Sequence, residues 1–231
     1  SHMKYLLCHL VLFSGIPGLF AQEEKDSPQA GFLNVVNLIT LKSPTFIEFG
    51  GFSLNGGEAI APGESSGILA IKPNTYALII SNEGAKPKKV SGDFLLENGK
   101  SVAIICYDEV KEFKDGSKET KLRFTVLVEA EETSGPRLSL VSLLKEPLTG
   151  VVVSGKGVPI APGGVYREEI VMGQRVTIVH DGELLADLEM AKPNHAIGFF
   201  YRDPMSDEIR LSLIQNEKLE YQPPLDREED E

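Results

Sequence analysis

Cysteine is scarce in this chain of 231 residues, which contains only Cys8 and Cys106. Cys8 lies in an N-terminal segment that we expect to be removed, so the mature chain would keep one thiol and form no internal disulfide. Its stability must then come from packed apolar cores. Because Cys106 lies in the apolar run 102–107, we predict a buried cysteine and not a catalytic nucleophile.

Positive charge is also in short supply. The sequence has 23 lysines and arginines against 34 acidic residues, a net charge of −11. Such a chain repels nucleic acid and anionic lipid, and no basic cluster interleaved with aromatic residues offsets this. We therefore exclude nucleic acid as a partner. The sequence also has no Asn-x-Ser/Thr sequon, which favours a bacterial periplasm or cell surface over glycosylated eukaryotic secretion.

Sequence motifs for catalysis are missing as well. The two histidines of the mature chain, His180 and His195, have no second ligand at metal-binding spacing. There is no Gly-x-Ser-x-Gly motif for a serine hydrolase, and the glycines around Lys156 join strands instead of opening a helix. Acidic residues gather in segments 108–115 and 203–208, where calcium remains an alternative to solvated loops. We predict no enzyme activity, no cofactor and no metal.

The N-terminus has the composition of a secretory signal peptide. Ser1-His2 is typical of a cloning remnant, and Met3 and Lys4 precede an apolar core that ends near Ala21. We expect cleavage after residue 21, with a retained membrane anchor as the alternative. Residues 22–30 are polar and predict a flexible leader.

A repeated turn organises the rest of the sequence. Ile60-Ala61-Pro62-Gly63 occurs again as Ile160-Ala161-Pro162-Gly163, and the flanking segments match in the same order. The matching segments are 33–38 with 138–143, 76–79 with 176–179, 93–94 with 187–188, 102–107 with 196–201, and 122–126 with 209–213. We infer an internal duplication of domain size. Pro62 fixes φ and Gly63 permits a positive φ, so we predict structural turns, with a binding role as the alternative.

Short apolar segments separated by Gly, Pro and Asn turns predict strands throughout. Segment 183–190 also fits two turns of helix, but its alternation favours a strand. The charged segment 108–120 predicts a long exposed hairpin loop. The fold class we predict is all-β, with two tandem immunoglobulin-like β-sandwich domains. We expect the domains to span 31–132 and 133–221 and to touch each other, because the segment that joins them is short. An acidic disordered tail is expected at 222–231.

Each copy resembles a family of exported bacterial β-sandwich domains of unknown function. The matching pieces are Val35-Val36-Asn37, Pro73-Asn74-Thr75-Tyr76 and Asn98-Gly99-Lys100-Ser101. The second copy departs from them, with Ser142 in place of the Asn and Pro193-Asn194 in place of Gly-Lys. The resemblance implies a sandwich in a secreted or surface-anchored bacterial protein, and it supplies no catalytic residues.

These features predict a non-catalytic exported bacterial protein of the periplasm or cell surface, with a structural or protein-interaction role. Its partners would be another envelope protein, a second copy of itself or a glycan, with no membrane span after signal cleavage. The alternative is a glycan-binding module or carbohydrate-active enzyme that uses loop carboxylates and tyrosines. A third reading is an adhesin- or pilus-associated subunit that accepts a strand at an open edge. The interaction-surface candidates are Tyr76, Tyr166, Asp203 and Asp207.

Overall fold

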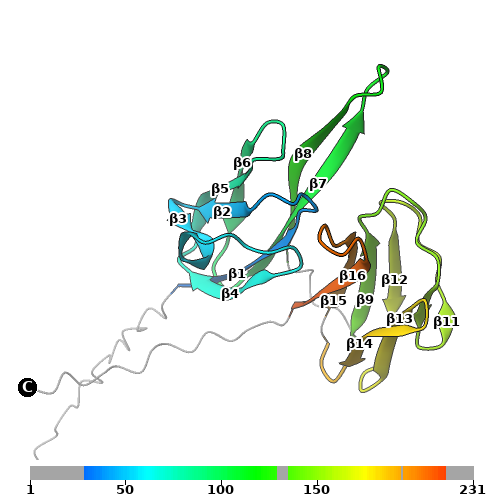
Figure 1. Cartoon of the computed structure of the whole chain (residues 1–231). Coiled ribbons are helices and arrows are strands. Elements are labelled where there is room, and N and C mark those ends of the chain that lie inside the picture. The colour runs from blue at the N-terminus through cyan, green and yellow to red at the C-terminus, as the bar shows by residue number, and fades with distance from the viewer. Residues whose placement is uncertain (1–28, 129–134, 194, 217–231) are drawn as a thin grey trace, which may run out of the picture.

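The computed structural model describes residues 29–128, 135–193 and 195–216, and in these ranges the chain is built almost entirely of strands (Figure 1). The predicted signal peptide, most of the leader and the acidic tail lie outside the described residues. The first copy contains β1 (Gly31–Leu38), β2 (Thr45–Phe49), β3 (Phe52–Ser53), η1 (Leu54–Gly57), β4 (Ser65–Ile71), β5 (Asn74–Asn82), β6 (Lys89–Leu96), β7 (Ser101–Glu112) and β8 (Lys118–Val128). The second contains β9 (Arg137–Ser142), β10 (Val151–Val153), β11 (Lys156–Gly157), β12 (Val165–Glu169), β13 (Arg175–His180), β14 (Glu183–Glu189), β15 (His195–Arg202) and β16 (Ile209–Asn216).

The two halves have the same topology, strand for strand. The first copy has sheets of order β4-β1-β7-β8 and β3-β2-β5-β6, and the second has β12-β9-β15-β16 and β11-β10-β13-β14. Parallel pairing of β1 with β7 recurs as parallel pairing of β9 with β15. The register also agrees with the sequence alignment, since Cys106 lies opposite Phe124 and the aligned Phe200 lies opposite Leu211. The prediction of two tandem β-sandwiches is confirmed.

Each sandwich has its own apolar core. In the first copy, buried side chains such as Leu33, Leu78 and Ile104 pack between the two sheets. In the second, Leu138 and Ile178 take the corresponding places. Strands alternate core-facing and outward residues, so the same alternation that predicts strands also fills the cores. Segment 183–190, for which a helix was the alternative, forms strand β14.

The two copies meet through a third apolar cluster. It joins the outer face of the β4-β1-β7-β8 sheet to the outer face of the β12-β9-β15-β16 sheet. Its members form six pairs of aligned positions: Val36 and Val141, Leu38 and Leu143, Ala103 and Ile197, Ile105 and Phe199, Tyr107 and Tyr201, Leu127 and Ile214. Each copy thus contributes the same patch, as the two subunits of a symmetric dimer do. The predicted contact between the sandwiches is confirmed.

One element differs between the copies. The predicted loop 108–120 is for the most part not a loop, because β7 continues to Glu112 and pairs with β8 from Lys118 onward. We call this projecting part of the hairpin, residues 108–121, the arm. Figure 1 shows it extending beyond the rest of the first sandwich. Its cross-strand neighbours include Lys111 opposite Glu119 and Glu112 opposite Lys118, and opposite charges in such positions stabilise pairing. The prediction of a loop was therefore wrong for most of this segment, because charged residues also form paired strands.

The first sandwich begins slightly earlier in the chain than predicted. Ala30, in the predicted leader, is buried, and its N–H binds Asn98 Oδ1 at 3.1 Å. The first sandwich therefore includes this residue.

Among the residues that the structure describes, no helix is long and apolar enough to cross a membrane.

Candidate functional sites

The repeated turns are tied to the first strand of each copy. Gly63 donates its N–H to Asn37 O at 2.7 Å, and the buried Asn37 side chain donates to Ile60 O at 2.7 Å. In the second copy, Ser142 replaces Asn37 and donates its backbone N–H to Gly164 O at 3.0 Å. Ile60 and Ile160 both enter their cores. These contacts support the predicted structural role of both turns.

The turn of the first copy also contributes to the contact between the copies. A Cβ atom added at Gly63 would overlap the hydroxyl oxygen of Tyr201 and lie 3.1 Å from its Cζ. Ser212 Oγ lies 3.5 Å from Gly63 O. Gly163, in the second turn, would carry a Cβ with nothing within 4 Å. The two identical turns therefore have different surroundings.

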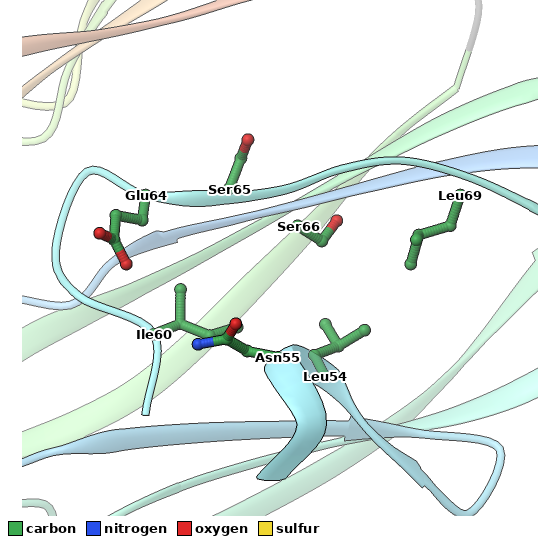
Figure 2. Close-up of a pocket in the computed structure, with 7 residues that line it drawn as sticks. All are labelled: Leu54, Asn55, Ile60, Glu64, Ser65, Ser66 and Leu69. Atoms are coloured by element: carbon green, nitrogen blue, oxygen red, sulfur yellow. The ribbon is translucent and has the colours of Figure 1, made fainter. Parts of the chain in front are cut away.

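A pocket of about 340 Å³ lies under the first turn. Figure 2 shows the turn and β4 on one side of it and η1 on the other. Its lining combines apolar and polar side chains: Leu54, Asn55, Ile60, Glu64, Ser65, Ser66 and Leu69. Several of the polar groups already have local partners. Glu64 Oε2 accepts from Ala61 N at 3.0 Å, and Ser66 Oγ accepts from Val35 N at 3.0 Å.

A larger groove, of about 610 Å³, lies at one edge of the second sandwich, between the β13–β14 turn and β16. Its lining consists of His180, Asp181, Glu183, Leu184, Leu185, Arg202, Glu208, Ile209, Arg210 and Leu211. At the corresponding edge of the first copy, the Phe124 ring lies 2.5 Å from where a Cβ of Gly92 would stand. The position of Phe124 is taken by the smaller Leu211 in the second copy. We attribute the opening of the groove to this exchange.

The charges at this groove hold the β15–β16 turn together. Asp203 accepts from Met205 N at 2.8 Å, and this hydrogen bond lowers the pKa of its carboxyl, with a smaller contribution from Arg210 at 3.0 Å. Asp207 lies in the left-handed region with φ +62, and its carboxylate lies 3.8 Å from Arg202. The two predicted candidates Asp203 and Asp207 therefore share one turn and have structural partners there.

The two tyrosine candidates lie in different sandwiches, and each is partly covered. Tyr76 stacks on Phe94 with ring centroids 5.8 Å apart and donates its hydroxyl to Lys72 O at 2.6 Å. Tyr166 donates to Glu168 at 2.7 Å, and burial together with this carboxylate raises its pKa to about 12. Tyr166 lies opposite Leu140, which lies opposite Gly198 and not at the β15–β16 turn. The structure therefore brings neither tyrosine together with Asp203 and Asp207.

The thiol of Cys106 is fully buried, as predicted, and burial raises its pKa far above the usual range. Of the residues with a described position, no three or more His, Cys, Asp or Glu side chains gather as they would around a metal ion. In the predicted acidic loop 108–115, Asp108 instead accepts hydrogen bonds from the backbone N–H and the hydroxyl of Thr40.

The arm is the feature that the sequence predicts only as an exposed loop. Arg123 pairs with Glu109 at 3.1 Å near its base, and Lys118 pairs with Glu112 at 3.6 Å near its tip. Phe113, which directly follows β7, is 36% exposed and has Lys111 Nζ 5.2 Å from its ring centroid. Pairing of β1 with β7 stops at Leu38 and Tyr107, so the arm projects as two strands without a third. In the sequence, the opposite charges spread over 109–121 are the feature that could have indicated a paired hairpin.

Comparison with known proteins adds little. No protein-family model matches the sequence, and no curated protein matches it. Among solved structures, the chain is similar to CBMbc, a family CBM26 module of Amy13K from Eubacterium rectale in complex with maltoheptaose. The identity is 12%, the match covers 79% of this chain and 96% of that one, and the TM-score is 0.25. A likeness this weak does not indicate a shared function.

Proposed function

We propose that this chain is a non-catalytic, exported bacterial envelope or surface protein that acts in adhesion or assembly by binding another protein. The arm of the first sandwich is the observation that carries the proposal. The second copy has only a short turn between β15 and β16 at the equivalent place. Because the second sandwich forms without an arm, folding does not require one.

The arm has the properties of a contact element. Its aromatic side chain, Phe113, lies near the tip, where burial by a partner would remove apolar surface from water. Its many charged side chains keep the open strand edges from pairing with other chains at random. A partner with complementary charges and an apolar pocket for Phe113 fits this surface. Such a partner would be another envelope protein or a second copy of this chain.

Removal of the arm tests the proposal. Val110 and Thr120 lie directly opposite one another, and Thr120 O accepts a hydrogen bond from Lys86 N at 2.8 Å. Asn-Gly in place of 111–119 would therefore close the hairpin with a two-residue turn and keep this hydrogen bond. The free energy of unfolding should change by less than about 1 kcal/mol, because the arm lies outside the core. A pull-down from an envelope extract of the source bacterium should lose the specific partner.

A matched pair of substitutions provides the control. Phe113→Ser and Phe52→Ser both remove an exposed phenylalanine of the first sandwich, and Phe52 is the more exposed at 68%. Only Phe113→Ser should weaken partner binding. An arm-deleted protein that captures every partner of the wild type would contradict the proposal. So would catalytic turnover that Asp108→Ala or Asp203→Ala abolishes, since it would assign an enzyme function.

Glycan binding is a second candidate, favoured by the pocket in Figure 2, whose lining combines polar side chains with Leu54, Ile60 and Leu69. Pockets of this size hold small ligands, and the Asn55 amide and Glu64 carboxylate offer hydrogen-bonding groups for sugar hydroxyls. A glycan array, followed by calorimetric titration of any positive glycan, tests this candidate. Glu64→Gln should weaken binding, whereas arm deletion should not.

A further inference from the structure

Four polar side chains converge on the outer face of the β12-β9-β15-β16 sheet. Strand register places Arg137 opposite His195 and Ser139 opposite Arg167. Neighbouring strands lie about 4.8 Å apart, so these residues are neighbours on the sheet. All four point away from the sandwich core, because alternate residues such as Leu138 lie inside it.

The middle of this cluster is a partly buried hydrogen bond. Ser139 Oγ and His195 Nε2 lie 2.8 Å apart, and Ser139 is only 6% exposed. Partial burial lowers the pKa of His195, and the positive charges of Arg137 and Arg167 lower it further. The imidazole is therefore neutral at pH 7 and keeps one N–H as a donor.

The two arginines differ from the other arginines whose positions the structure describes. Arg123, Arg175, Arg202 and Arg210 all pair with carboxylates. Within the same described ranges, Arg137 and Arg167 have no ion pair and no side-chain hydrogen bond, although Glu169 lies opposite Arg137 in the register. In a chain with a net charge of −11, this concentrates unpaired positive charge at one place.

The first sandwich shows that folding does not require this cluster. Its equivalent positions are Phe32 for Arg137, Asn34 for Ser139, Ile68 for Arg167 and Ser101 for His195. None of these residues is charged. The same topology is thus built without cations, and the cluster is a feature of the second copy alone.

We infer that Arg137, Ser139, Arg167 and His195 form a binding site for the oxyanion group of a ligand: a phosphate, a sulfate or a carboxylate. Guanidinium groups donate paired hydrogen bonds that match such oxygens in geometry and charge. Because the hydroxyl of Ser139 and the neutral imidazole of His195 use one hydrogen in their mutual bond, the pair keeps one O–H or N–H, which adds a donor without adding charge. The oxyanion has two possible sources, a free ligand or the acidic side chains within 226–231 of this chain, which follow β16 in sequence. The backbone of β16 at Asn216 pairs with His195.

Calorimetric titration of the full chain with sodium phosphate, sodium sulfate and sodium acetate, at constant ionic strength, tests the inference. At least one of the three anions should bind saturably at one site. NMR of the His195 ring should show a chemical-shift change that saturates at the same concentration. Arg137→Gln and Arg167→Gln should each weaken binding about tenfold or more, since a charge-assisted hydrogen bond is lost.

Arg175→Gln is the matched control, because it removes the same charge from the same sandwich at a paired arginine. It should leave the affinity within about twofold of wild type. A full-length variant with neutral residues in place of the acids at 226–231 separates the two sources. Binding seen only in that variant would support the site and identify the acidic segment as its occupant. The inference fails if no anion binds saturably to either protein, or if Arg175→Gln weakens binding as much as Arg167→Gln.

Discussion

Replacement of glycine by alanine in the two repeated turns compares one substitution in two surroundings. Gly63 has φ +86 and Gly163 has φ +65, both in the region that L-residues disfavour. Alanine should cost about 1–2 kcal/mol at either position from backbone strain alone. This shared cost is the baseline, and Gly163→Ala measures it, because its added Cβ has nothing within 4 Å.

Gly63→Ala carries a second cost. Its Cβ would overlap the hydroxyl oxygen of Tyr201 and approach Cζ to 3.1 Å. Tyr201 is 5% exposed and belongs to the cluster that joins the two copies, so its ring cannot move aside without disturbing that contact. Overpacking of this kind costs about 1–3 kcal/mol. The total for Gly63→Ala is then about 2–5 kcal/mol.

Urea unfolding followed by circular dichroism gives both free energies. Tyr201→Phe, which removes the overlapping oxygen, should recover part of the loss in the Gly63→Ala background. In the Gly163→Ala background it should recover nothing. Equal losses for the two alanine variants would refute the reasoning, since the Tyr201 contact would then have no energetic consequence.

Three further predictions concern buried polar groups. Asn37→Ala should lower the free energy of unfolding by about 1–3 kcal/mol, because it leaves the buried carbonyl of Ile60 and the N–H of Ile39 unpaired. Asn37→Ser, which introduces the residue of the second copy, should lower this free energy by less, as urea unfolding would measure. In a variant of residues 22–231, which lacks Cys8, the thiol of Cys106 should not react with a thiol reagent until urea unfolds the protein, because Cys106 is buried and burial raises its pKa; rapid reaction in buffer would contradict this. Burial raises the pKa of Asp108 above 3.8, so protonation favours the folded state, and the stability of wild type relative to Asp108→Asn should rise as pH falls from 7 toward 4. Denaturant titrations at several pH values would measure the slope, and a slope of opposite sign would count against the burial argument.

The sequence predicted the strands and the duplication because both depend on local patterns. Alternation in 122–126 and turn residues such as Pro62 and Gly63 are visible without knowledge of long-range contacts. The face-to-face arrangement of the copies was only partly predictable. The runs 102–107 and 196–201 are apolar on both faces, which is typical of strands covered on both sides. Which faces meet depends on tertiary packing, and no local pattern specifies that.

The candidate sites were harder to predict, for two physical reasons. The arm looked like a loop because its residues are charged, yet cross-strand pairing of opposite charges stabilises an exposed hairpin. The oxyanion cluster joins β9, β12 and β15, so register alone brings Arg137, Arg167 and His195 together. The sequence around His195 shows no partner for it, because these neighbours come from distant segments. We attribute the groove beside Leu211 to the smaller side chain at the position of Phe124. The sequence alignment pairs these two residues, but only the fold shows that they lie at this edge.

The central claim is that two copies of one sandwich pack against each other through equivalent positions. A protease site inserted within 129–134 would allow the join to be cut after the protein has folded, and size-exclusion chromatography with light scattering would then measure the mass. We expect both fragments to elute together at the mass of the uncut chain, because Ile105 and Phe199 and their neighbours hold the copies together without a covalent link. Elution as two separate single sandwiches would contradict the account.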